Sequence, residues 1–501
     1  MVFPDPLPLV PAPASVVAGE GRMAVTPTTR VSGPAAPATQ LIDAIGLRTG
    51  IRPALVDDGA DIALGIDPTA ATSEGYTLSV ADTAEVAGAD DAGLFYGVHT
   101  LLQLLRQDEG GTWGFLRANL TDAPRFAYRG VMLDVARHFF GVDDVKRFID
   151  ATSSLKFNHL HLHLSDDQGW RIEIESWPLL TELASANAAN GDRGGFYTKD
   201  DYREIVAYAA SRHMVVVPEI DVPGHTHAIG VAYPEIVEAP ALNAALIEQS
   251  KELDQPLPAA GAPYEGWGVG HSSVRIHDER TYDFIRDVTR ELAELTPGPY
   301  LHIGGDESLG TSQADFELFA ARATEIVVAA GKTPIAWHEM GSATQIAAGA
   351  IGQYWGSLVP QGTHASEARS FIDRGGALIM SPSDAAYLDM KYSSDFPLGL
   401  AWAGTVDVRT AYSWEPTTVV DVPESAILGV EAPLWSETTR TYADVEQLAF
   451  PRAAALAEIA WSAPERRDWE SFRTRLGALA PLWNAQGIGF HPSAEIPWSE
   501  R

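Results

Sequence analysis

Beyond residue 124 the sequence alternates between short apolar runs and longer segments of helical periodicity. The apolar runs are bounded by polar or turn-forming residues, as buried strands are. There are eight of them: 129–137, 159–167, 215–225, 300–308, 333–340, 350–356, 377–384 and 427–437.

Most of these runs are separated by segments in which apolar residues recur at helical spacing, such as 143–157, 199–213 and 279–295. Strand and helix repeated eight times predict the α/β fold of a (β/α)8 TIM barrel. The stretch 229–277 is rich in Ala, Pro and Gly and is too long for a simple strand-to-helix connection. We expect it to be a loop insertion over the site.

The first 123 residues lack this rhythm. Helical spacing is present at 37–50 and 93–107, and strand-like alternation at 61–67 and 75–80. The turn-like Asp-Ala-Pro within 121–126 then interrupts the pattern. We therefore predict two domains, a small one over 1–123 and the barrel over 124–501.

Polar and aromatic residues gather at the C-terminal ends of the predicted strands. In a barrel of this kind the functional groups lie at that end. Acids and tryptophans without a shared role would be scattered over both ends, so this distribution predicts a functional site. The residues, strand by strand, are Asp134, Arg137 and His138; Asp166 and Asp167; Glu219, Asp221 and His225; Asp306 and Glu307; Trp337 and Glu339; Trp355; Tyr387 and Asp389; and Trp435 and Glu437.

Composition narrows the class of ligand. The formal net charge of −32 opposes nucleic-acid binding, which needs basic patches, and fits a solvated acidic surface. The chain has no cysteine, which excludes disulfides and cysteine-ligated metals.

No apolar run approaches the ~20 residues that a membrane helix needs. Residues 1–15 do not read as a signal peptide, so the chain as it stands is expected in the cytoplasm, or outside the cell if a leader has been removed.

Carboxylates together with tryptophans point to a sugar as the ligand. Indole rings pack on the apolar C–H face of a pyranose, and charged groups bind its hydroxyls. The chain has 13 tryptophans. Four of them fall in the segments at the barrel end: Trp337, Trp355, Trp402 and Trp435.

Two other motifs have alternative interpretations. His161 and His163 alternate, so both rings point to one side of a strand and could bind a metal. Metal-dependent amidohydrolase barrels carry such a pair on the first strand and a lysine at a later one; here the pair is on the second, and no lysine ends a strand. Gly304 and Gly305 are not followed by the GK[ST] of a phosphate loop, so we expect them to permit a tight backbone turn.

Six motifs occur in order along the chain: LDVARHF (133–139), HLHLSDDQGWR (161–171), VPEIDVPGH (217–225), HIGGDE (302–307), YLDMKY (387–392) and EAPLWSE (431–437). Together they resemble the β-N-acetylhexosaminidases of glycoside hydrolase family 20, particularly the bacterial exo-acting members. The N-terminal segment is similar to the small α+β domain that precedes the barrel in this family. The resemblance implies hydrolysis of terminal non-reducing β-linked N-acetylglucosamine or N-acetylgalactosamine from chito-oligosaccharides or glycoconjugates, without cofactor or metal.

The resemblance also implies a role for each matching residue. Glu307 would be the general acid, Asp306 would orient and stabilise the 2-acetamido group, and Tyr387 would donate a hydrogen bond to the acetamido oxygen. The other implied substrate-binding residues are Trp337, Trp355 and Trp435 as pocket walls; Arg137, Asp389 and Glu437 at the sugar hydroxyls; Asp166 and His225 as a relay behind the acid; and Trp402 as a further platform.

The adjacency of Asp306 and Glu307 bears on mechanism. Most glycosidases hold two carboxyl groups ~5–5.5 or ~6.5–9.5 Å apart on either side of the bond, and neighbouring residues do not easily straddle a sugar. The pair fits substrate-assisted chemistry, in which the acetamido oxygen attacks the anomeric carbon, an oxazolinium ion forms and the configuration is retained. A non-catalytic glycan-binding barrel and a metal-dependent amidohydrolase using His161 and His163 remain alternatives.

Overall fold

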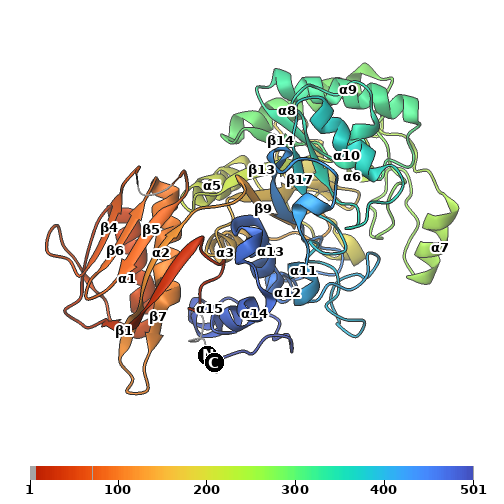
Figure 1. The fold of residues 1–501 in the computed structure, drawn as a ribbon. Coiled ribbons are helices and arrows are strands. Elements are labelled where there is room, and N and C mark those ends of the chain that lie inside the picture. The colour runs from red at the N-terminus through yellow and green to blue at the C-terminus, as the bar shows by residue number, and fades with distance from the viewer. Residues whose placement is uncertain (1–6, 70–71, 500–501) are drawn as a thin grey trace.

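The computed structural model describes residues 7–69 and 72–499, which form a small sheet domain followed by a barrel (Figure 1). The sheet has the strand order β1-β8-β5-β6-β4-β2-β3, with β7 paired to β8. Its strands are β1 (Ser15–Ala24), β2 (Arg30–Ser32), β3 (Ala54–Leu55), β4 (Ile62–Ile66), β5 (Tyr76–Val80), β6 (Ala84–Gly88), β7 (Leu105–Gln107) and β8 (Trp113–Asp122).

Two helices accompany this sheet, α1 (Ala35–Thr49) and α2 (Asp91–Leu104). The N-cap Asp90 accepts a hydrogen bond from the Gly93 amide, which satisfies a free donor at the start of α2. The prediction of a helix over 93–107 is wrong at its end. Residues 105–107 pair with β8 instead, because their backbone groups meet an open strand edge there.

Eight parallel strands close into a barrel in the order β10-β13-β14-β15-β16-β17-β18-β9. Seven of them lie within predicted apolar runs and β9 begins one residue before its run, so the predicted TIM barrel is confirmed. The strands are β9 (Tyr128–Asp134), β10 (His159–His163), β13 (Val215–Glu219), β14 (Tyr300–His302), β15 (Thr333–Trp337), β16 (Ile351–Tyr354), β17 (Leu378–Met380) and β18 (Ile427–Ala432).

Helices follow most of the strands, and the connections at one barrel end are long. The hairpin of β11 (Ser165–Asp166) and β12 (Gly169–Trp170) follows β10 directly. The main helices are α3 (Val142–Ser153), α4 (Leu179–Leu183), α5 (Lys199–Ala210), α6 (His227–Ala232), α7 (Ala244–Glu252), α8 (Glu279–Leu295), α9 (Gln313–Ala329), α10 (His364–Asp373), α11 (Val408–Tyr412), α12 (Tyr442–Ala449), α13 (Arg452–Trp461), α14 (Trp469–Gly477) and α15 (Ala480–Gln486). Short 3-10 turns are η1 (Ala189–Gly191), η2 (His338–Ser342), η3 (Pro416–Thr418), η4 (Glu424–Ala426) and η5 (Pro464–Arg466). None of the helices within 7–69 and 72–499 has the length and apolar character required to cross a membrane.

A buried ion pair joins the two domains. Lys156 Nζ lies 2.8 Å from Asp122 Oδ2 and from the Tyr76 hydroxyl, so a barrel lysine is held by the last residue of β8. Trp461, at the end of α13, donates its indole N–H to Asp122 over 2.9 Å and packs in the core of the small domain. These contacts fix the small domain against the barrel on either side of the predicted boundary.

Candidate active site

A cavity of about 370 Å³ opens at the C-terminal ends of the barrel strands, and eight of the twelve predicted site residues line it. Those eight come from five strand ends and the loops that follow them, which is why they meet only once the barrel closes. They are Arg137, Asp306, Glu307, Trp355, Tyr387, Trp402, Trp435 and Glu437. The remaining four, Asp166, His225, Trp337 and Asp389, are buried behind this lining.

The backbone beyond β14 turns sharply to present the two acids. Gly304 and Gly305 have φ values of 63° and 100°, in the left-handed region that only glycine adopts freely. A Cβ on Gly304 would lie 1.7 Å from a carboxylate oxygen of Asp221, so no other residue fits. Glu307 itself has φ of 43°, an unfavourable value for a side-chain-bearing residue and a form of strain found at functional sites.

One imidazole faces both acids. His225 Nε2 lies 3.7 Å from Asp306 Oδ2 and 3.6 Å from Glu307 Oε2. Its Nδ1 is hydrogen bonded to Asp166 Oδ1 over 3.1 Å. Burial alone would lower the pKa of His225, but the charges of Asp166, Asp306 and Asp221 raise it well above its usual range. His225 therefore sits as a cation between Asp166 and the acid pair.

Asp166 connects this imidazole to two more basic groups. Its Oδ2 lies 2.7 Å from Arg137 NH1 and 2.7 Å from His163 Nε2. Burial by itself would raise the pKa of Asp166, but the charges of Arg137 and His225 hold it well below its usual range. Asp166 is thus a fixed anion, and it positions both His225 and the Arg137 side chain that lines the cavity.

Two further carboxyl groups, Asp221 and Glu339, lie near Asp306, and the sequence predicts no role for either. Asp221 Oδ1 accepts a hydrogen bond from the Gly305 amide over 3.0 Å. Burial, then the neighbouring Asp306, raise the pKa values of Asp221 and Glu339 well above their usual range. Burial also raises the pKa of Asp306, while His225 opposes the shift. Their place at strand ends was the only sequence signal for Asp221 and Glu339.

Aromatic side chains form the other walls of the cavity. Trp355 donates its indole N–H to the carboxylate of Glu339, at 3.0 and 2.9 Å from the two oxygens, which fixes the ring. The Trp402 ring centroid lies 5.9 Å from those of both Trp355 and Tyr387. Trp402 is 55% exposed, unlike the other three tryptophans of the predicted site, so it stands at the mouth of the cavity.

Trp337 differs from its predicted place. It is completely buried and does not line the cavity; its ring centroid lies 5.9 Å from that of Trp435, which does. Its indole N–H donates to Glu219 Oε1 over 2.9 Å. Trp337 therefore supports the wall from behind, where its ring lies near those of His161 and His302.

Asp389 and Glu437 form a second acidic corner. Asp389 accepts a hydrogen bond from the Trp435 amide over 3.3 Å and is 2% exposed. Burial, then Glu437, raise its pKa well above the usual range. Burial likewise raises the pKa of Glu437 to about 7, against the attraction of Arg137. Groups that bind sugar hydroxyls can thus be donors as well as acceptors at this corner.

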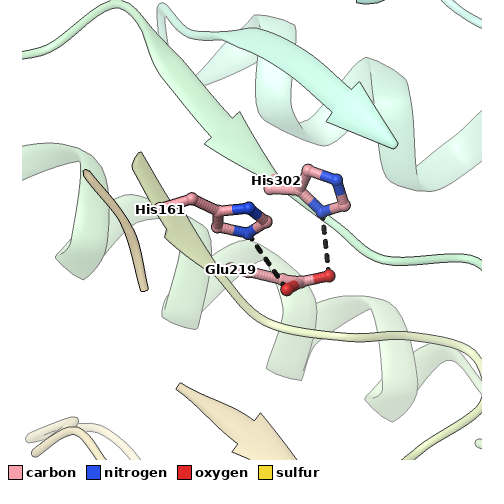
Figure 2. Close-up of side chains that lie close together, drawn as sticks. All are labelled: His161, Glu219 and His302. Atoms are coloured by element: carbon pink, nitrogen blue, oxygen red, sulfur yellow. Dashed lines mark ion pairs between the residues drawn. The ribbon is translucent and has the colours of Figure 1, made fainter. Parts of the chain in front are cut away.

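Below the cavity, the barrel interior holds a cluster of histidines and glutamates. His161 Nε2 and His302 Nδ1 lie 3.0 and 2.9 Å from the two oxygens of Glu219 (Figure 2). These three residues bring potential metal-ligand atoms within 4.8 Å of one another. However, His161 Nδ1 is also hydrogen bonded to Glu431 over 2.8 Å, so each of the two ring nitrogens lies close to a carboxylate. This pairing favours an ion-pair cluster over metal binding by His161 and His163.

The insertion over 229–277 reaches the cavity. It carries α7, and it contributes Gln249, Leu253, Trp267 and Val269 to the lining. Two side chains outside the insertion hold it in place. Gln168 donates to the carbonyl of Gly266 over 2.7 Å and Asn187 to that of Tyr264 over 2.8 Å.

The chain is similar to one family of glycosidases in both of its domains. The family model "Glycosyl hydrolase family 20, catalytic domain" matches residues 126–315 and 308–464, and "Glycosyl hydrolase family 20, domain 2" matches 7–123. A β-N-acetylhexosaminidase of Cellulomonas fimi is 39% identical over 435 residues, which are 85% of this chain and 82% of that protein.

Two solved structures are similar over nearly the whole chain. One is a glycoside hydrolase family 20 β-N-acetylglucosaminidase, 54% identical with a TM-score of 0.92, covering 99% of this chain and 100% of that one. The other is the N-acetyl-β-hexosaminidase of Streptomyces plicatus in complex with Thio-NAglucal. It is 42% identical with a TM-score of 0.90, and the similarity covers 100% and 99% of the two chains.

Proposed function

The chain belongs to glycosyl hydrolase family 20 and is an exo-acting β-N-acetylhexosaminidase, and we propose that Glu307 is its general acid and Asp306 the residue that holds the substrate's 2-acetamido group. The observation that carries this assignment is the shared imidazole, since His225 faces both carboxyl groups. The substrates are terminal β-linked N-acetylhexosamines of chito-oligosaccharides or glycoconjugates.

The different exposure of the two acids supports this division of roles. The Glu307 side chain is 34% exposed, so it can reach a leaving-group oxygen and later a water molecule. The Asp306 side chain is 10% exposed and lies deeper, where an acetamido group would be shielded from water. A cationic oxazolinium ion beside Asp306 favours the ionised carboxyl, because an opposite charge lowers a carboxyl pKa.

The reaction then follows from these positions. Glu307 gives its proton to the glycosidic oxygen while the acetamido oxygen attacks the anomeric carbon, and the leaving sugar departs. Asp306 accepts a hydrogen bond from the acetamido N–H as positive charge develops there. Tyr387 donates to the acetamido oxygen, and Trp435 and Trp355 hold the group in attack geometry. Glu307 finally takes a proton from the water that opens the intermediate, and the β configuration is retained.

A thiazoline analogue of the bicyclic intermediate tests this mechanism. We expect inhibition at concentrations at least 10²-fold below the KM for substrate, as for other transition-state mimics. The measurement is the inhibition constant against nitrophenyl β-N-acetylglucosaminide hydrolysis, with N-acetylglucosamine itself as the control. Equal inhibition by the analogue and the control sugar contradicts an acetamido nucleophile.

We further propose that the leaving sugar lies between Trp402 and the insertion. Trp402 and Leu253 are 55% and 44% exposed, yet both line the same cavity as Glu307. An apolar surface kept exposed at the mouth of a polar site is typical of ligand contact. Leu253→Ala and Trp402→Ala should raise KM for di-N-acetylchitobiose more than KM for the aryl glycoside. Equal KM changes for the two substrates contradict this placement.

A further inference from the structure

Glu219, the last residue of β13, is fully buried and stands between the aromatic wall and the acid relay. Its Oε1 lies 2.9 Å from Trp337 Nε1 and 2.9 Å from His302 Nδ1. Its Oε2 lies 3.0 Å from His161 Nε2 and is also paired with His163 Nδ1. Figure 2 shows Glu219 between His161 and His302.

Through its Oε1 atom, Glu219 is connected to the aromatic wall of the cavity. Trp337 is completely buried, and its indole N–H has Glu219 as its hydrogen-bond acceptor. The ring of Trp337 packs beside Trp435, which lines the cavity. The orientation of the buried ring, and with it the support of Trp435, therefore depends on Glu219.

Through its Oε2 atom, Glu219 is connected to the general acid, Glu307. His163 bridges Glu219 to Asp166, with Nε2 2.7 Å from Asp166 Oδ2. Asp166 in turn holds His225, which faces Glu307 at 3.6 Å. Along this path the neighbouring imidazoles lower the pKa values of Glu219 and Asp166, and the neighbouring carboxylates raise those of His163 and His225, so each group favours the charged form of the next.

Packing does not account for a carboxylate at this place. Burial alone would raise the pKa of Glu219, but the charges of His163, His302 and His161 hold it well below the usual range, so Glu219 is an anion in the barrel centre. Replacing such buried ionic groups by apolar residues of similar volume is often neutral or stabilising. The contacts of this carboxylate with the Trp337 indole N–H and with His163 therefore point to a positioning role.

We propose that Glu219 is a positioning residue for catalysis: it holds the wall through Trp337 and, through His163 and Asp166, holds His225 toward Glu307. The inference rests on the proposed function of Glu307. It predicts that the barrel interior controls how well the acid protonates a leaving group, although Glu219 does not touch the substrate.

Glu219→Gln tests the proposal, with Glu431→Gln as the matched control. Glu431 is an equally buried carboxylate of the same cluster and is paired with His161, but the path to Glu307 does not pass through it. For both variants, kcat/KM is measured for aryl N-acetylglucosaminides of graded leaving-group pKa and as a function of pH. The charged and titratable groups facing the relay are His161, His163 and His302 around Glu219; Arg137 at Asp166 and His163; and Asp166, Asp167, Asp221, Asp306 and Glu307 around His225.

In Glu219→Gln we expect a loss of roughly 10- to 100-fold on poor leaving groups, part of the 10²–10⁴-fold that a general acid supplies. The loss on activated aryl glycosides should be at least several-fold smaller, and the pH profile should shift. Glu431→Gln should keep the wild-type leaving-group dependence and pH profile. The proposal is overturned if both variants lose kcat/KM equally on all substrates and neither variant shows a shifted pH profile.

If Glu219→Gln does not fold, His163→Asn provides the second test. It breaks the path to Asp166 while leaving Glu219 and its bond to Trp337 in place. The same leaving-group signature supports the proposal, and an unchanged leaving-group dependence overturns it. A wild-type enzyme that hydrolyses none of these substrates contradicts the proposed function itself, so the two failures are distinguishable.

Discussion

His225 Nε2 lies 3.6 Å from the carboxylate of Glu307, on the far side of the same ring from Asp166. The backbone of each residue adopts a positive φ, 53° at His225 and 43° at Glu307. Such conformations cost about 1–3 kcal/mol each and persist where the surrounding structure imposes them. The loops after β13 and β14 thus hold both residues in unfavourable conformations that bring them face to face.

Glu307→Gln should lose activity according to the leaving group. The amide cannot donate a proton to a poor leaving group, so kcat/KM for di-N-acetylchitobiose should fall by roughly 10²–10⁴-fold. Dinitrophenyl β-N-acetylglucosaminide needs little protonation and should lose far less. Steady-state kinetics on the two substrates check this; equal losses contradict the acid assignment.

Asp306→Asn should impair both substrates alike. Its expected loss is roughly 10²–10³-fold in kcat, the usual effect of removing one preorganised electrostatic partner. The reason is that the acetamido oxygen displaces every leaving group, good or poor, and Asp306 stabilises the acetamido group in each of these displacements. The control is Glu307→Gln assayed in parallel, and near wild-type turnover of the dinitrophenyl substrate by Asp306→Asn excludes the proposed role.

Chelation should leave the enzyme active. His161 and His163 each face carboxylates through both ring nitrogens, so we expect full activity after prolonged dialysis against EDTA. Activity and thermal midpoint are compared before and after dialysis, with and without added zinc. A loss that zinc restores supports the metal-dependent alternative.

The free energy of unfolding should fall between pH 6.5 and 9, because the folded protein holds a proton on His161 that the unfolded chain releases. Burial opposes its charge, but Glu431 and Glu219 together raise the pKa of His161 to about 9 from a usual 6.5. The folded protein keeps this proton up to about pH 9, whereas the unfolded chain releases it near pH 6.5. This contribution is therefore complete below pH 6.5 and is lost as the pH rises through 9, a change of roughly 3 kcal/mol.

Urea unfolding at pH 6.5 and pH 9 measures this change, and His161→Gln is the comparison. The variant lacks the titrating group, so its free energy of unfolding should fall less over the same interval. Identical pH dependence in the wild-type protein and the variant is the contradictory outcome.

The spacing of apolar and polar residues along the chain predicted most of the barrel and much of the site. The eight apolar runs gave all eight barrel strands, and the acids and tryptophans at their ends gave the residues that line the cavity. The end of α2 was mispredicted, because Leu105–Gln107 continue the helical spacing but pair with the edge of β8. Periodicity reports which side of an element is apolar; it does not report that a partner strand competes for the same backbone groups.

The sequence by itself determined the order of strands and helices and the adjacency of Asp306 and Glu307, because these depend on spacing along the chain. Only the tertiary structure decided that Trp337 lies behind the wall, that the insertion supplies Leu253 and Trp267 to the cavity, and that Glu219 joins Trp337 to His163. Those relationships depend on how the strands are registered around the barrel. Burial and charge pairing across that register set the protonation of each group, and neither can be read from one strand alone.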